Sequence, residues 1–131
     1  MKNLIFLSLY YNIHVKTKYI MSIRLDKVQP KNKIQLKQLV AYAFKHNIYD
    51  LNFIDTSKIT DMSELFININ HNFDVSSWDV SNVTDMHALF YECNKFTGKG
   101  LENWNVSNVT DTRGMFKGCN RLTIPYWYDK L

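Results

Sequence analysis

The sequence is poor in the residue patterns on which catalytic and metal-binding proteins rely. It has only four glycines and two cysteines, and it contains neither a glycine-rich phosphate loop nor a nucleophile elbow. None of its four histidines has a second histidine at the spacing that zinc sites use. We therefore predict no catalytic residues, no cofactor site and no metal site, and we expect that the protein is not an enzyme.

The sequence also lacks an apolar run long enough to cross a membrane, which takes about 20 residues. Residues 4–11 are apolar and follow Lys2, as in a signal peptide, but Asn12 ends the run and no small-residue cleavage site follows. Three interpretations of residues 1–20 stay open: a tail or upstream extension with the natural start at Met21, a degenerate export signal, or a structured segment. The location therefore stays open between the cell surface or exterior and the cytoplasm.

Positive charge is concentrated in the N-terminal part of the chain. Residues 1–50 carry nine basic and two acidic residues, whereas residues 51–131 carry seven basic and ten acidic residues. A basic segment could contact nucleic acid or an anionic membrane. No aromatic residues alternate with the basic ones as in RNA-binding modules, so we expect a solvated helix face and no nucleic-acid partner.

What the sequence does contain is one unit written three times. The three copies read IDTSKITDMSELF from Ile54, WDVSNVTDMHALF from Trp78 and WNVSNVTDTRGMF from Trp104. Successive copies are 24 and 26 residues apart, as the threonines show (Thr60, Thr84 and Thr110). An internal repeat of this length indicates a repeat architecture, in which each unit covers the apolar face of its neighbour.

The second half of each copy predicts a short helix. Thr60 stands where an N-cap is wanted, and the following Asp61 places a negative charge at the positive end of the helix dipole. Met62, Leu65 and Phe66 then fall on one helical face, and the second copy repeats this pattern. The third copy departs from the pattern at two positions (Thr112 and Gly114).

The other half of each unit alternates apolar and polar residues, as short strands do. Leu51 with Phe53, Phe73 with Val75, and Trp104 with Val106 show this alternation. One short strand and one short helix per unit predict an α/β fold, a leucine-rich-repeat-like solenoid of three units over residues 51–131. Cys93 and Cys119 occupy equivalent places in two units, where they are either two buried thiols or, if the units stack closely, a disulfide.

A separate amphipathic helix is predicted before the repeats, in the segment 21–50. Its apolar residues follow the helical spacing i, i+3, i+4, i+7 and i+8 (Leu36, Leu39, Val40, Ala43 and Phe44), and Asn32 can act as the N-cap. We interpret this helix as the N-terminal cap of the solenoid. The competing interpretation is a basic helix that lies on a membrane surface.

The run WDVSNVTDM-x-x-LF-x-x-C, which starts at Trp78, resembles the repeat of BspA-type leucine-rich-repeat surface proteins. It is also similar to a repeated domain of unknown function in mycoplasma lipoproteins and in several intestinal bacteria. The resemblance covers residues 51–127. It implies a horseshoe solenoid displayed on a bacterial cell surface, and some members of the family are adhesins for host matrix proteins.

These observations favour a protein-binding or surface-adhesion module, a monomer whose unidentified protein partner could be a host surface or matrix protein. Aromatic side chains dominate binding hot spots, so the candidate contacts are Trp78, Tyr91, Trp104, Tyr126, Trp127 and Tyr128. Trp78 and Trp104 could instead belong to the core. Two alternatives remain: a truncated or decayed repeat paralogue without a partner of its own, and an enzyme on a repeat scaffold, for which Cys93 with His87 would be the nucleophile and base.

Overall fold

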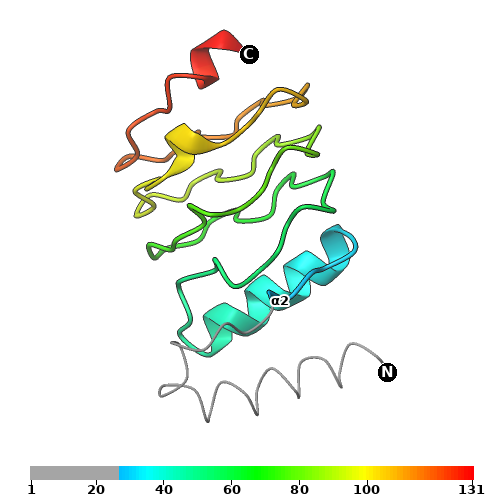
Figure 1. The fold of residues 1–131 in the computed structure, drawn as a ribbon. Helices are drawn as coiled ribbons and strands as arrows, with labels where there is room; N and C mark the ends of the chain where they lie inside the picture. The colour runs from blue at the N-terminus through cyan, green and yellow to red at the C-terminus, as the bar shows by residue number, and fades with distance from the viewer. Residues whose placement is uncertain (1–26) are drawn as a thin grey trace.

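The computed structural model describes residues 27–131, so the three interpretations of residues 1–20 lie outside the described residues. Three helical elements occur along the described chain: the α-helix α2 (Lys33–Lys45) and two short 3-10 helices, η1 (Leu101–Asn103) and η2 (Tyr128–Lys130). Helix α2 lies at one end of the molecule and η2 at the other, and the chain between them forms irregular loops that are stacked on one another (Figure 1).

Helix α2 confirms the predicted amphipathic helix and its cap. The side chain of Asn32 accepts a hydrogen bond from the backbone N–H of Gln35 at 3.0 Å, which satisfies one of the unpaired donors of the first turn. Its apolar face is buried against the loops through Leu36, Leu39, Val40 and Ala43. The 3.6-residue spacing of these side chains is therefore a true helical pattern.

The predicted α/β fold, a leucine-rich-repeat-like solenoid of strands and helices, is wrong. Residues 27–131 contain one α-helix and no β-sheet. Only isolated parallel bridges join neighbouring units (Val28 to Ile54, Asp50 to Asp74, Asp61 to Asp85, and Asp85 to Asp111). The stretches that alternate like strands run through turns and irregular backbone instead.

The three short helices predicted after the threonines are absent because the backbone turns left-handed twice in each unit. The first of these positions has φ of 60°, 50° and 63° (Glu64, Ala88 and Gly114), and the second has φ of 60°, 57° and 80° (Asn68, Glu92 and Gly118). A left-handed residue cannot continue a right-handed helix. The spacing of Met62, Leu65 and Phe66 therefore reflects inward packing from a series of turns, and not a helical face.

Backbone N–H groups that a helix would use internally bond to the next unit instead. Four alternate N–H groups of the first unit donate to four alternate carbonyls of the second at 2.9–3.0 Å (Met62 to Asp85, Glu64 to His87, Phe66 to Leu89 and Asn68 to Tyr91). The second unit donates to the third in the same way at 2.7–3.0 Å (Met86 to Asp111, Ala88 to Arg113, Phe90 to Met115 and Glu92 to Lys117). All four bonds in each set point in the same direction along the stack.

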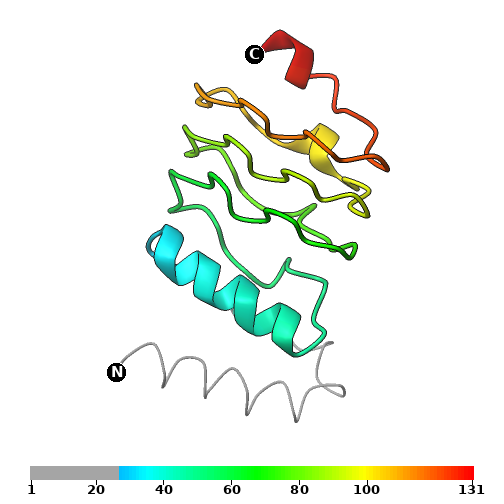
Figure 2. The ribbon, with the colours of Figure 1, turned by 180° about the vertical axis from the view of Figure 1, so that it is seen from behind.

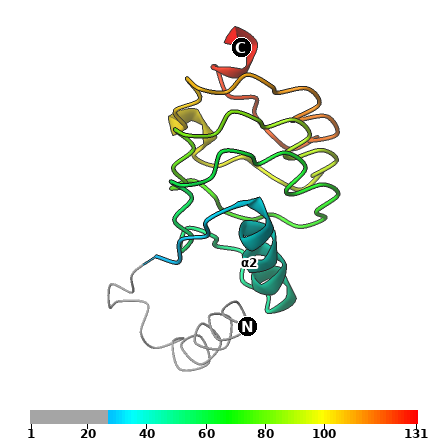
Figure 3. The ribbon, with the colours of Figure 1, turned by 90° about the vertical axis from the view of Figure 1, so that its right-hand side faces the viewer.

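Each unit therefore forms one layer of the molecule. We name these layer 1 (residues 54–77), layer 2 (residues 78–103) and layer 3 (residues 104–127). They lie one above another when the molecule is seen from behind and from the side (Figures 2 and 3). Because backbone hydrogen bonds join neighbouring layers, residues that are one repeat apart in the sequence occupy equivalent positions in successive layers.

A column of aromatic rings runs through the centre of the layers. Phe66 stacks on Phe90 with ring centroids 5.6 Å apart, and Phe90 stacks on Phe116 at 5.7 Å. Phe44 of α2 closes one end at 6.2 Å from Phe66, and Tyr128 closes the other at 5.0 Å from Phe116. Stacked aromatic pairs contribute about 0.5–1.5 kcal/mol each beyond their buried area, so the repeated phenylalanine is a core residue of every layer.

Candidate functional site

Three of the six predicted contact residues are tryptophans that lie inside the fold. Trp78, Trp104 and Trp127 expose only 3%, 5% and 5% of their surface. Each indole N–H donates to a backbone carbonyl 26 to 29 residues earlier in the chain, at 2.9 Å to Leu51, 3.3 Å to Val75 and 2.8 Å to Leu101. A buried indole normally pairs its N–H in this way. The tryptophans therefore join the layers and leave little surface for a partner to contact.

The three predicted tyrosines differ in exposure. Tyr126 is 66% exposed, and the ammonium of Lys130 lies 5.2 Å from the centre of its ring. Tyr91 is half-buried, with the Lys117 ammonium 5.6 Å from its ring. Tyr128 is half-buried against the aromatic column. The structure thus brings Tyr126 and Tyr128 to the same end of the molecule, near the C-terminus, while Tyr91 lies in layer 2.

Two apolar residues near Tyr126 were not predicted from the sequence. Ile124 is 44% exposed and Leu131 is 54% exposed. With Tyr126 they account for three of the five large apolar side chains that residues 27–131 expose; the other two are Ile34 and Tyr49. We call Ile124, Tyr126 and Leu131 the C-terminal apolar end. The available signal was their position in the last copy of the repeat or after it, because no following layer covers side chains there.

The repeated aspartates, which resemble a carboxylate array in the sequence, are turn residues. The Oδ1 atoms of Asp61, Asp85 and Asp111 each accept the backbone N–H of the residue two positions later, at 2.8, 2.9 and 3.1 Å. This bond defines an Asx-turn. The same turn recurs at Asp55 and Asp79. The aspartates therefore stabilise turns, and they do not lie at the helix N-termini that were predicted for them.

Asp61, Asp85 and Asp111 are stacked across the three layers, and each has its own cationic neighbour. Lys33 of α2 lies 3.1 Å from Asp61, His87 lies 2.9 Å from Asp85 and Arg113 lies 2.6 Å from Asp111. Hydrogen bonds from Arg113 hold the pKa of Asp111 at about 2. The hydrogen bond to Asp85 raises the pKa of His87 above its ordinary value. These ion pairs offset the repulsion between like charges in the column.

Asp85, His87 and Asp111 form the one group in residues 27–131 with enough donors in reach of one another for a metal ion, since their ligand atoms lie within 4.8 Å. Two carboxylates and an imidazole suit a divalent cation. However, the Arg113 guanidinium bonds both carboxylate oxygens of Asp111, and His87 bonds Asp85 through Nδ1 and Glu64 through Nε2. The geometry therefore indicates an ion-pair cluster whose donors are already engaged.

The two cysteines are free thiols in equivalent places. Cys93 Sγ donates to the Phe66 carbonyl at 2.7 Å, and Cys119 Sγ donates to the Phe90 carbonyl at 2.9 Å. Cys93 is fully buried, and burial raises the pKa of its thiol to about 12. Because the thiolate is the nucleophilic form, Cys93 is poorly suited to the role of a nucleophile with His87.

None of the described helices combines the length and the apolar character that crossing a bilayer requires. A family model described as "Mycoplasma protein of unknown function, DUF285" matches residues 34–128, which is more than half of the chain. The chain belongs to this family. The match spans most of α2 and all three layers. It confirms the predicted likeness to a mycoplasma repeat family of unknown function, while the BspA-type leucine-rich-repeat assignment has no such support. No curated protein and no solved structure matches the chain.

Proposed function

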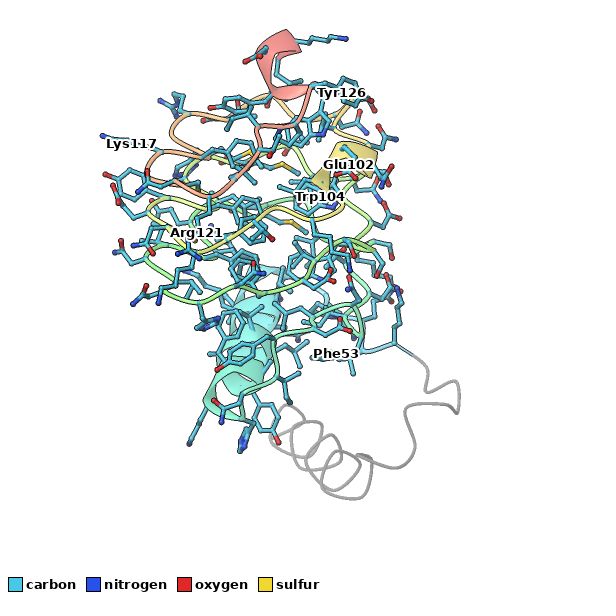
Figure 4. All side chains as sticks on the ribbon, turned by 90° about the vertical axis from the view of Figure 1, so that its left-hand side faces the viewer. Phe53, Glu102, Trp104, Lys117, Arg121 and Tyr126 are labelled. Atoms are coloured by element: carbon cyan, nitrogen blue, oxygen red, sulfur yellow. The ribbon has the colours of Figure 1, made fainter. Side chains whose placement is uncertain are left out.

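We propose that this member of the family is a non-enzymatic protein-binding module, and that it contacts a protein partner through its C-terminal apolar end. The observation that carries the proposal is the clustering of exposed apolar side chains within the last eight residues, headed by Tyr126 at 66% exposure. In Figure 4 Tyr126 lies near the C-terminal end of the stack, away from α2. An exposed tyrosine is typical of a binding hot spot, and exposed apolar side chains mark interaction sites.

The chemistry of the other conspicuous residues supports the non-enzymatic part of the proposal. The aspartates of the column and His87 are engaged in turns and ion pairs. Cys93 is fully buried, with a thiol pKa of about 12. These groups stabilise the layers, and each has a structural role that explains its place in the repeat.

A capture experiment tests the proposal. The full chain is immobilised, and retained proteins are quantified by mass spectrometry for the wild type, Tyr126→Ala and Ile34→Ala. Ile34 is a matched control, because it is 69% exposed but lies on α2 at the other end of the molecule. We expect a protein that the wild type and Ile34→Ala retain at micromolar concentration and that Tyr126→Ala releases.

Two results would contradict the proposal: no protein enriched above the blank support, or equal retention by all three proteins. The first of these would favour a repeat paralogue without a partner. A host surface or matrix protein is the finer part of the proposal and follows only from the resemblance of the repeat to surface proteins. An extracellular-matrix fraction is therefore included among the extracts.

A further inference from the structure

The last layer ends in a row of backbone donors that bond no acceptor among residues 27–131. By analogy with the two layers before it, the N–H groups of Thr112, Gly114, Phe116 and Gly118 point away from layer 2. Within residues 27–131 none of the four donates to a backbone carbonyl. Within the same residues the carbonyl of Thr110 accepts no backbone N–H, although the equivalent carbonyls of Thr60 and Thr84 each accept one from the following layer. We call residues 110–118 the upper edge.

The upper edge is open on its outer side. Gly114 and Lys117 are exposed, and 85% of the Arg113 side chain is accessible. Figure 4 shows Lys117 projecting outward near the C-terminal end of the stack. Trp127 and Tyr128 pack on Phe116 and so close the core on the inner side. The C-terminal residues therefore cover the aromatic column but supply no carbonyls to the row of donors.

We propose that the upper edge binds a segment of another polypeptide, which adds one more strip of backbone to the stack. Unpaired backbone groups at an exposed edge are a template for such pairing. The interior of the molecule shows what fits. Residues 85–91 and 111–117 each present four alternate carbonyls to the layer before them and include a left-handed residue at Ala88 or Gly114.

The positive charge of the upper edge favours an acidic segment as its binding partner. Arg113 and Lys117 belong to the upper edge, and both are exposed. Among the described residues Lys117 forms no ion pair, whereas Arg113 is paired with Asp111. A cation without an ion-pair partner beside a row of N–H donors attracts carboxylates as well as carbonyl oxygens. A segment with the pattern of residues 82–93 meets this requirement, because it carries Asp85 and Glu92 and no Lys or Arg.

A second copy of the whole protein does not fit, because α2 covers the opposite edge of the stack. Lys33 bonds Asp61 and Ser63, and Phe44 packs on Phe66. Layer 1 of one molecule therefore cannot reach the upper edge of another while α2 is in place (Figure 1). The occupant is an exposed acidic segment of a different protein, and Tyr126 is not part of this site, so the inference stands apart from the proposed function.

The test uses the isotope-labelled full chain and a synthetic peptide that reproduces residues 82–93 with Cys93→Ser. Amide resonances of the protein are followed as the peptide is added. We expect shifts that saturate and slowed hydrogen exchange at Gly114 and Gly118, whose N–H groups the peptide would cover. A peptide of the same composition in scrambled order is expected to bind at least about tenfold more weakly, because it keeps the charge and loses the pattern.

Charge-reversed variants provide the second arm. Lys117→Glu is expected to weaken peptide binding by about fivefold or more. Lys95→Glu is the matched control, since Lys95 is an exposed lysine of layer 2 outside the upper edge, and it is expected to leave the affinity unchanged. The inference is overturned if Gly114 and Gly118 do not respond at millimolar peptide, if the scrambled peptide binds equally well, or if the shifts centre on Tyr126 and disappear in Tyr126→Ala.

Discussion

The effect of Gly114→Ala on the free energy of unfolding has opposite signs for the observed left-handed backbone and for a helix, so this substitution distinguishes the two. Gly114 has φ of 63°, in the left-handed region. A Cβ at this position would find no atom nearer than Cδ2 of Tyr91, at 3.8 Å. The new methyl group therefore causes no clash, and the change in free energy reports the backbone conformation alone.

The size of the effect follows from the conformational preference of alanine. A residue with a Cβ loses about 1–2 kcal/mol in the left-handed region, so Gly114→Ala is expected to lower the free energy of unfolding by about that amount. The reverse change at the equivalent position, Ala88→Gly, relieves the same strain at φ of 50°. The added freedom of glycine in the unfolded chain offsets about 0.5–1 kcal/mol of this gain. We expect Ala88→Gly to be neutral or stabilising.

Urea denaturation followed by tryptophan fluorescence measures both variants, because Trp78, Trp104 and Trp127 are all buried in the native state. The midpoint should move to lower urea for Gly114→Ala with an unchanged slope. In a helix the signs would reverse, since alanine is favoured over glycine by about 1 kcal/mol. A stabilised Gly114→Ala together with a destabilised Ala88→Gly would refute the left-handed backbone.

Three further predictions concern contacts between and within layers. Trp104→Phe removes the donor to the buried Val75 carbonyl and should cost about 1–3 kcal/mol of stability in the same denaturation assay. Burial alone would raise the pKa of Asp74, but hydrogen bonds from Ser76 and Asn52 and the charge of Lys99 lower it from 3.8 to about 2. The resulting stabilisation is present above pH 3.8 and is lost as the pH falls towards 2, and Asp74→Asn should remove about 1–2 kcal/mol at pH 7, allowing for partial exposure. The pKa of His87 is raised, so the pH dependence has the opposite sign: its contribution to stability is complete below the ordinary histidine pKa of 6.5 and is lost as the pH rises through the higher pKa of the folded state. The plot of stability against pH above pH 6 should therefore be flatter for His87→Asn than for the wild type.

The sequence was sufficient to predict α2, its Asn32 cap and the equivalence of the three units. A 13-residue helix with a regular apolar face has few alternatives. The units themselves were misassigned because Met62, Leu65 and Phe66 at i, i+3 and i+4 point inward equally well from a helix turn and from a series of turns between layers. Short apolar patterns do not distinguish these cases, and the bonds that decide between them join residues 23 to 25 positions apart.

One signal of the true backbone was present in the third copy. Gly114 and Gly118 interrupt the helical pattern at the two positions where each unit turns left-handed. Taken alone, Gly114 reads as decay of the last unit, whereas it is the residue best suited to that conformation. The first two copies have Glu64, Asn68, Ala88 and Glu92 at these positions, so only the third copy indicates a left-handed backbone by its residue types.

The candidate contacts were predicted from residue type, which does not report burial. Trp78, Trp104 and Trp127 recur because each indole N–H bonds a backbone carbonyl about one repeat earlier in the chain, so their repetition marked a structural role. Ile124 and Leu131 were missed because isolated aliphatic residues carry no distinguishing pattern. The open donors of the upper edge lie beyond sequence reasoning, since a backbone N–H looks the same at every residue except proline.

The central claim is that each layer donates its alternate N–H groups to the next layer, and scalar couplings across hydrogen bonds test it most directly. In an isotope-labelled sample, the amide nitrogens of Phe66 and Phe90 should couple to the carbonyl carbons of Leu89 and Met115, in keeping with N–H to carbonyl distances of 3.0 Å for both pairs. Couplings from these nitrogens to the carbonyl four residues earlier, as in an α-helix, would contradict the account.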